Sequence, residues 1–262
     1  MFPLKDNIPN EHFPLITVAL VVINILAYLL SIRHGGSLLG GPSTETVLHD
    51  AAIPYDFTHP GNYCAVIEAG RDEFGNVVTE SKCQDHPFPG QVSTWVSAFT
   101  AMFMHGGILH IAGNMLFLAI FGPNVEDAMG RLRFTAFYLL GGLVALAAQI
   151  AVGPNSTAPT LGASGAIAAV LGGYLVLYPR ARILSLVFIV FFVTIIEVPA
   201  VFLLGFWFLE QVYFGSANLT NPVGGGGGVA YFAHVGGFLF GVALIRLFAV
   251  RQKSEPPRFP VY

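Results

Sequence analysis

Residues 160–174 read "TLGASGAIAAVLGGY" and are the most informative segment of the chain for its fold. A serine, Ser164, stands there among small residues, and the run that follows it is otherwise apolar down to Tyr178. At about 1.5 Å per residue, a helix from Ser164 to Tyr178 is only about 22 Å long. The hydrocarbon core of a bilayer is about 30 Å thick, so such a span can begin below the membrane surface if the loop leading into it is buried in protein. The pattern therefore places a hydroxyl inside the membrane.

The composition indicates an integral membrane protein. Hydrophobic residues make up 54% of the 262 residues and charged residues only 10%, with a mean hydropathy of +0.67. A soluble domain has about 25% charged residues, so this chain lacks the polar side chains to cover a water-facing surface. The net charge of −3, without a basic block, argues against a nucleic-acid partner.

The apolar segments predict an all-α membrane protein with six spans, each of which needs about 20 residues. The predicted spans are 13–32, 107–127, 134–152, 164–178, 195–214 and 229–248. Residues 93–104 are expected to form an amphipathic or re-entrant segment, because Gly106 and Gly107 break the long apolar stretch that holds them.

The fifth span is placed by its flanking residues. Thr194 and Glu197 fit a capping box, and Pro199 fits an early helical turn, so this helix should start near residue 195. Residues 182–194 would then lie at the inner interface. The loop 215–228 after this span ends in five glycines, and we expect it to be irregular.

Arginine and lysine residues set the orientation of the spans. The loops after spans three and five contain neither residue type, whereas basic residues follow spans two, four and six: Arg131, Arg133, Arg180, Arg182, Arg246, Arg251, Lys253 and Arg258. By the positive-inside rule, both termini are cytosolic. Residues 1–12 and 251–262 are therefore expected to be cytosolic tails of a six-span domain at 13–250, with a large extracytoplasmic loop at 33–106.

The two cysteines, Cys64 and Cys83, both fall in this first loop. A disulfide between them is possible if the loop faces an oxidising side, and two free thiols are the other possibility. Their spacing does not resemble a metal-binding pattern such as C-x-x-C.

Unusual polar residues occur at the outer ends of spans two, four and six. They lie within roughly 10 Å of depth by the helical rise, and they are His105, His110, Asn114, Ser164 and His234. Taken singly, each has a structural explanation such as helix packing or an interhelical hydrogen bond, and Gly237 with Gly241 forms a G-x-x-x-G packing pair. Several costly polar groups at one depth instead indicate one site.

The chemistry that suits these residues is acyl transfer. A serine needs a base to act as a nucleophile, and His234 is the available base for Ser164. Side chains of His110 and Asn114 can donate to an oxyanion, as can the backbone N–H of Ser164 in the first turn of its helix. Gly162 lets the preceding loop bend close to the reacting carbonyl. Since no Asp or Glu is placed to orient the histidine, we predict a Ser–His dyad.

These motifs together resemble the rhomboid family of intramembrane serine proteases. The matching residues are the G-x-S-G motif at 162–165, His105, His110 and Asn114 in the second span, Glu126, Gly130 and Arg131 after it, Trp207 and Gln211 in the fifth span, and the A-H-x-x-G motif at 233–237. The resemblance implies a six-helix rhomboid-like bundle in which Ser164 is the nucleophile and His234 the general base and acid. It implies that His110, Asn114 and the Ser164 amide stabilise the oxyanion.

The resemblance also implies the partners and the location. The substrates would be other membrane proteins, cut in or next to a transmembrane segment, without a cofactor or metal. Span five and the loop 215–228 look like the lateral gate and cap of the family. We expect a multi-pass protein of a bacterial plasma membrane, embedded in the lipid bilayer, with its active site opening to the extracytoplasmic side.

One departure from the family pattern keeps an alternative open. Many members have an aromatic residue four positions after the serine, where this chain has Ala168, so the support of His234 is in question. A catalytically weak or inactive rhomboid-like protein that binds membrane-protein clients is therefore the alternative function. A zinc enzyme built on His105, His110 and His234 is a second alternative, although no acidic residue is placed beside them. A transporter or channel is a third, and the chain shows no internal repeat of the transporter kind.

Overall fold

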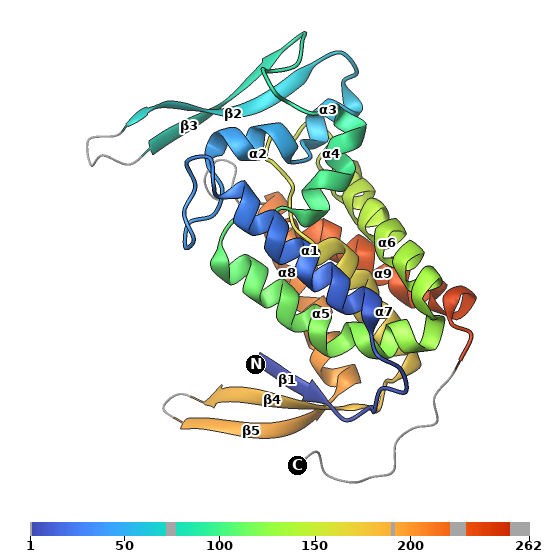
Figure 1. Ribbon diagram of the computed structural model, residues 1–262. Coiled ribbons are helices and arrows are strands. Elements are labelled where there is room, and N and C mark those ends of the chain that lie inside the picture. Colours follow the sequence, from blue (N-terminus) through green and yellow to red (C-terminus); the bar gives the residue numbers. More distant parts are fainter. Residues whose placement is uncertain (1, 72–76, 190–191, 221–228, 252–262) are drawn as a thin grey trace.

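The computed structural model describes residues 2–71, 77–189, 192–220 and 229–251, and Figure 1 shows it as mostly helical. Six helices form one bundle: α1 (Leu15–Ser31), α5 (Ile108–Met129), α6 (Arg131–Val152), α7 (Ser164–Leu177), α8 (Ala200–Thr220) and α9 (Tyr231–Phe248). Each corresponds to one predicted apolar segment. Of these, α5, α6, α8 and α9 are long and apolar enough to cross a membrane, whereas α1 and α7 are apolar but shorter.

Helix α7 lies at the centre of the bundle, where every residue from Gly165 to Tyr174 is buried. Its small residues let α9 approach closely. A Cβ atom added at Gly237 would collide with the carbonyl of Gly165, and one added at Gly241 would collide with that of Ala169. The predicted packing pair thus lies at the α7–α9 contact, which brings the N-terminal ends of these two helices together.

The long apolar stretch at 93–122 is broken where the sequence predicts. Helix α4 (Thr94–Thr100) and a 3₁₀ turn, η1 (Ala101–Phe103), end before Gly106, and α5 begins at Ile108. The break turns the chain, so that α5 starts a new helix at the end of the bundle where α7 and α9 also begin. We call this the outer end, after the predicted orientation, and the opposite end the inner end.

Two acidic residues at the inner end of α5 hold the N-terminal segment in place. The first N–H groups of α1 have no partner within their helix, and Glu126 accepts hydrogen bonds from the amides of Ile16 (3.0 Å) and Thr17 (2.8 Å). The adjacent Asp127 accepts bonds from the amide of Glu11 (2.6 Å) and the ring of His12 (2.8 Å).

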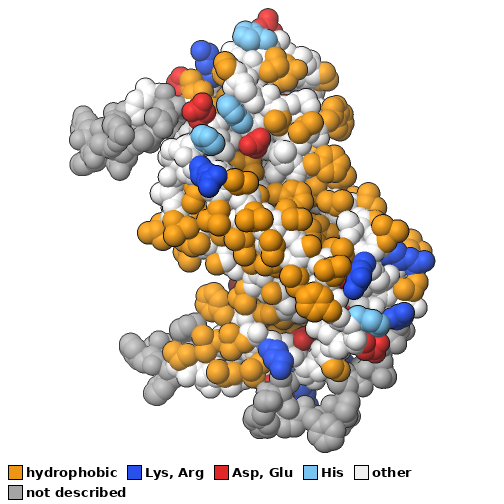
Figure 2. Space-filling view, viewed as in Figure 1, with side chains coloured by type: hydrophobic (Ala, Val, Ile, Leu, Met, Phe, Trp, Pro, Cys, Tyr) orange, Lys and Arg blue, Asp and Glu red, His pale blue; other side chains and the backbone are white. Residues whose placement is uncertain are grey.

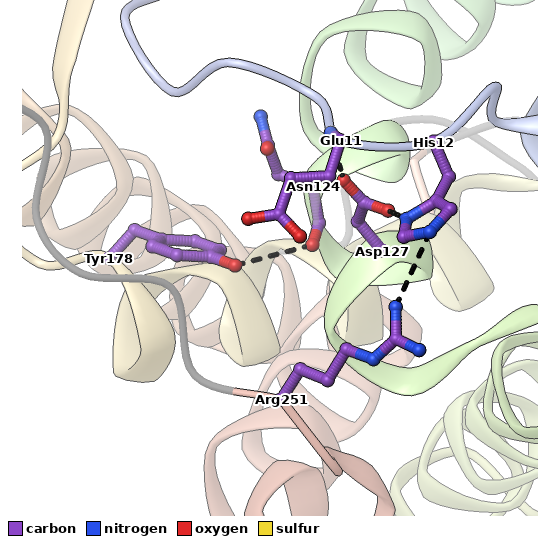
Figure 3. Close-up of polar contacts among 6 residues, drawn as sticks. All are labelled: Glu11, His12, Asn124, Asp127, Tyr178 and Arg251. Carbon is purple, nitrogen blue, oxygen red and sulfur yellow. Dashed lines mark hydrogen bonds and ion pairs between the residues drawn. The ribbon is translucent and has the colours of Figure 1, made fainter.

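Figure 3 shows how this network extends to other helices. The second ring nitrogen of His12 contacts the Arg251 guanidinium after α9 at 3.5 Å, and the hydroxyl of Tyr178 donates to the carbonyl of Asn124 at 3.4 Å. The chain after α9 is therefore tied to the segment that precedes α1, and the end of α7 is tied to α5.

The expectation of an all-α protein is confirmed only in part: the chain is mostly helical, but two small antiparallel sheets lie at opposite ends of the bundle (Figure 1). The outer sheet is a hairpin of β2 (Tyr63–Arg71) and β3 (Val77–Gln84). The inner sheet has the strand order β1-β4-β5, from β1 (Phe2–Asp6), β4 (Arg182–Ile189) and β5 (Phe192–Pro199). The N-terminal segment is thus a sheet strand as well as a tail.

The predicted capping box at Thr194 and Glu197 is also wrong. Both residues lie in β5, and Glu197 accepts a hydrogen bond from the guanidinium of Arg182 across the hairpin at 2.9 Å. The segment is rich in Ile and Val, which favour a strand once a second strand is available to pair with. Helix α8 therefore starts later than predicted, at Ala200, and continues to Thr220. The glycine run at 224–228 lies outside the described residues.

The first loop contains two short helices, α2 (Thr44–Asp50) and α3 (Pro54–Thr58), besides the outer hairpin. Cys64 and Cys83 are directly opposite each other in the hairpin and form a disulfide. The buried carboxylate of Asp56 accepts hydrogen bonds from the amide of Cys64 (2.8 Å) and the side chain of Gln91 (3.3 Å). Burial raises the pKa of Asp56 to about 6.

Candidate active site

The candidate site forms where the outer ends of α7 and α9 meet. Ser164 is the first residue of α7, and His234 lies in the first turn of α9. The Ser164 Oγ is 2.7 Å from the His234 Nε2, which is hydrogen-bonding distance. The histidine is buried, so the pair is held in a protein environment with one side open to a cavity.

The second nitrogen of the His234 ring contacts Gln211 of α8. The Gln211 Oε1 lies 2.8 Å from the His234 Nδ1, and the Gln211 Nε2 donates to the carbonyl of Trp207 at 3.3 Å. An amide oxygen only accepts, so the Nδ1 carries the hydrogen and leaves the Nε2 free to accept from Ser164. This is the tautomer that a general base requires.

The pattern described above has an aromatic residue at position 168 to support His234, and this chain has Ala168 there. An aromatic contact to His234 comes instead from Trp207 of α8. The ring of Trp207 lies 5.7 Å from the ring of His234 with an angle of 35° between the planes. A carboxylate is the group expected to orient such a histidine, so the sequence alone predicts no role for Gln211. The spacing of Trp207 and Gln211, four residues apart on one helix face, is the signal that could have predicted their joint contact.

The side chains of His110 and Asn114 line the same cavity, one turn apart on α5. The Nδ1 of His110 accepts from the Gly106 amide at 3.3 Å, which leaves the Nε2 as the protonated nitrogen of the neutral ring. The Nδ2 of Asn114 is buried and has no hydrogen-bond partner among the described residues. A buried donor without a partner lowers the stability of the folded protein by about 1–3 kcal/mol. Asn114 therefore has a donor that an acceptor in the cavity could pair with.

Gly162 lies between His110 and Ser164. Its φ is +124°, a conformation that favours glycine, and an added Cβ atom would lie 2.8 Å from the Nε2 of His110. The Gly162 amide already donates to the carbonyl of Ala101 at 2.8 Å. Gly162 therefore shapes the site by its backbone and offers no free amide to an oxyanion.

The cavity in front of Ser164 has a volume of about 820 Å³. Apolar side chains from the first loop, α5, α7 and α8 make up much of its wall: Leu39, Val47, Phe117, Ile167, Leu171 and Trp207. An apolar cavity with a few convergent polar groups is the usual form of a binding site. The arrangement can hold an apolar peptide segment with one carbonyl at Ser164.

The remaining predicted residues lie outside this cavity. His105 is buried beside His110, with the two rings 5.1 Å apart. Within the described part of the chain, no three His, Cys, Asp or Glu side chains gather in a group able to hold a metal ion. Gly237 and Gly241 lie at the helix contact, and Cys64 and Cys83 lie in the outer hairpin.

The chain is similar to proteins of a known family. Residues 92–251, more than half of the chain, match the family model described as Rhomboid domain. The chain belongs to the rhomboid family. This rhomboid chain is 32% identical over 161 residues to "Rhomboid protein 1, mitochondrial" of Saccharomyces cerevisiae, an alignment that covers 58% of this chain and 41% of the yeast protein.

Two further relatives extend the comparison. "Rhomboid protease GluP" of Bacillus subtilis is 33% identical over 133 residues, which is 50% of this rhomboid and 25% of GluP. "Rhomboid-like protein 11, chloroplastic" of Arabidopsis thaliana is 29% identical over 176 residues, with 62% and 54% of the two chains covered. The alignments thus span about a quarter to a half of these relatives' own lengths.

The membrane that holds this rhomboid follows only in outline. The family and the apolar helices indicate an integral membrane protein. The expected bacterial plasma membrane is not supported, because relatives named as mitochondrial and chloroplastic match as well as a bacterial one.

Proposed function

We propose that this rhomboid is an intramembrane serine endopeptidase that uses Ser164 and His234 as a dyad. The observation that carries the proposal is the 2.7 Å contact between the Ser164 Oγ and the His234 Nε2 at the wall of an apolar cavity. Membership in a family that includes a protein named as a protease adds to it.

The first half of the reaction forms an acyl-enzyme. As the Ser164 Oγ attacks the substrate carbonyl, the His234 Nε2 takes the hydroxyl proton, and the electron pair of the C=O bond moves to the oxygen. The tetrahedral intermediate collapses when the C–N bond breaks, and His234 gives its proton to the leaving amine. In the second half, water attacks the acyl-enzyme with His234 again as the base, which releases the acid and restores Ser164.

The oxyanion is stabilised by donors that the free protein leaves available. The unpaired Nδ2 of Asn114 gains the acceptor that it lacks, and the protonated Nε2 of His110 faces the same cavity. Donors placed where charge develops are worth more in the transition state than in the ground state, because the unreacted carbonyl carries less charge.

Gln211 takes the place that an acid has in a triad. Its amide oxygen holds the Nδ1–H of His234, which keeps the ring in the reactive tautomer and orientation. It adds no negative charge, so the pair remains a dyad supported by a neutral acceptor. Gln211 is a positioning residue in this proposal and does not touch the substrate.

We infer that the domain at 13–250 has six spans, including the short helices α1 and α7. The N-terminus of α7 is surrounded by other helices and by the first loop, which lets a 14-residue helix begin below the surface. The termini then lie in the cytosol, and the cavity opens to the extracytoplasmic side. The substrates are transmembrane segments of other proteins that unwind locally, because a helical peptide hides its carbonyl groups.

The test is active-site labelling with a fluorescent fluorophosphonate, combined with cleavage of a model transmembrane substrate in liposomes. Wild type should label and cleave, and Ser164→Ala and His234→Ala should do neither. Ser97→Ala is the matched control, since Ser97 is a buried serine whose hydroxyl donates to the Thr94 carbonyl. A folded wild type that neither labels nor cleaves would contradict the proposal and favour the inactive, client-binding alternative.

A further inference from the structure

The inner sheet β1-β4-β5 projects sideways from the inner end of the bundle, and its surface is rich in hydrophobic side chains (Figures 1 and 2). Its base is held firmly. The buried carboxylate of Asp6 accepts hydrogen bonds from the side chain of Asn124 (2.7 Å) and the hydroxyl of Tyr174 (2.6 Å). The amide of Ala200 donates to the carbonyl of Ala181 at 2.8 Å. The sheet therefore has a fixed position relative to the helices.

The polarity of the sheet changes along its strands. At the base, Arg182 is hydrogen-bonded to Glu197 of the opposite strand. Farther from the base, the sequence from Leu186 to Val193 reads "LVFIVFFV", without a polar residue. A sheet with one face in water alternates apolar and polar residues from one face to the other. A change along the strands is instead expected of an element that passes from water into hydrocarbon.

Both faces of the sheet expose apolar side chains. Ile195 and Ile196 are successive residues of β5 and so point to opposite faces, yet they are 54% and 41% exposed. Val193 is 61% exposed, and Phe2 on β1 is 55% exposed. Contact with another protein through one face would leave the other face in water.

Besides the buried Asp6, the charged side chains of the sheet are Lys5, Arg182 and Glu197, the hydrogen-bond partner of Arg182. Lys5 of β1 pairs in register with Leu184, and Arg182 is two residues before it on β4, so both basic residues lie near the base. Basic side chains at the inner surface of a membrane are attracted to anionic lipids. The exposed apolar residues Val193 and Ile195 of β5 lie farther from the base than these basic residues.

We propose that the inner sheet lies in the cytoplasmic leaflet, with its apolar end among the upper acyl chains and its basic end at the headgroups. The occupant of its two faces is lipid. Among the described residues, no further strand extends the sheet beyond β1 or β5. Hydrocarbon does not tolerate an open sheet edge, so the sheet stays near the interface. A second copy could pair with the edge of β5, but such pairing would cover an edge and leave both apolar faces exposed. The inference rests on membrane embedding and is independent of the catalytic proposal.

Site-specific fluorescence tests this placement. The two native cysteines are joined in a disulfide, so a single new cysteine can be labelled with an environment-sensitive nitrobenzoxadiazole dye. The test positions are Val193→Cys and Ile195→Cys. Phe206→Cys on α8, which is 61% exposed, is the lipid-facing control, and Lys82→Cys on the outer hairpin is the water-facing control.

The labelled proteins are placed in lipid nanodiscs, where both membrane faces meet the buffer. Lipids with a nitroxide near the headgroup should quench the dye at Val193 and Ile195 more strongly than lipids with a deep nitroxide, and iodide should quench it as weakly as at Phe206. Quenching by iodide to the extent seen at Lys82 would overturn the proposal, because the sheet would then lie in water. A dye that neither quencher reaches would overturn it in favour of a protein contact. Two positions are used so that one disturbed site does not decide the outcome.

Discussion

The bundle contains two clusters of polar side chains, one near each end, and they differ in how well their hydrogen bonds are satisfied. At the inner end, Glu126 accepts from two amides of α1, and Asp127 accepts from Glu11 and His12. At the outer end, the Nδ2 of Asn114 has no partner among the described residues and borders a cavity. The inner cluster thus completes its own hydrogen bonds, whereas the outer cluster keeps a donor available, as expected of the proposed active site.

The largest effect is expected from a change at Ser164, the proposed nucleophile. Ser164→Ala should lower the rate of substrate cleavage by about 10⁶-fold, the loss typical when a nucleophile–base pair is broken. The free energy of unfolding should stay close to that of wild type, because the change removes one hydroxyl at a cavity wall. Cleavage rates and unfolding in mixed detergent micelles measure the two quantities. Cleavage that survives the change would assign the reaction to another residue.

A change at Asn114 separates activity from stability. Asn114→Leu should lower the cleavage rate by about 10²- to 10³-fold, as loss of an oxyanion donor does. It should leave the free energy of unfolding unchanged or raise it by about 1–3 kcal/mol, because a buried donor without a partner is removed. A marked loss of stability would show that Asn114 is paired in the folded protein and that its role is structural, like that of the inner cluster.

The role of Gln211 can be read from a set of isosteric changes. Gln211→Met removes the acceptor at similar volume and should lower kcat by about tenfold to a hundredfold, up to the lower limit of what general base catalysis supplies, because His234 itself remains. Gln211→Glu keeps an acceptor and should retain more of the activity than Gln211→Met. Glu210→Gln, on another face of α8, is the control. Equal loss in both Gln211 variants, or a change in KM alone, would contradict a positioning role.

The inner cluster should show the opposite behaviour. Glu126→Gln leaves one acceptor oxygen for the first turn of α1 and should lower the free energy of unfolding by about 1–3 kcal/mol. The cleavage rate per folded molecule should not change. Glu45→Gln on the exposed part of α2 is the control for loss of charge. A stable variant with lost activity would undo the distinction between the two clusters.

The smallest effect concerns a further buried acid, Asp56 in the first loop. Its pKa rises from 3.8 to about 6 on folding, mainly through burial. The folded state therefore binds this proton more tightly, so its contribution to stability is full below pH 3.8 and is lost as the pH rises through about 6. Thermal unfolding between these pH values should show the trend, and Asp56→Asn should remove it. Asp85→Asn at an exposed site should leave the trend intact.

The sequence predicts the helices well where a local signal marks them. The break before α5 follows from Gly106 and Gly107, and the start of α7 at Ser164 follows from the small residues around it. The segment at 182–199 could not be assigned in this way, because a continuous apolar run fits a buried strand as well as a helix. Its strand partner β1 lies far away at the N-terminus, and pairing over that distance leaves no local pattern.

The candidate site shows a similar division. Ser164, His234, His110 and Asn114 are predictable because their chemistry is recognisable and their spans place them at one depth. The contact of Gln211 with His234 depends on how α8 packs, which spacing alone does not determine. The same holds for Glu126, whose partner Thr17 is 109 residues away along the chain.

The proposed dyad is best tested by locating the residue that a covalent inhibitor modifies. Wild-type protein is treated with a fluorophosphonate and digested, and the modified residue is located by mass spectrometry. We expect one adduct, on the Oγ of Ser164. We expect no adduct when His234 is replaced by Ala in a folded protein. An adduct on another serine, or labelling of Ser164 that does not depend on His234, would contradict the dyad.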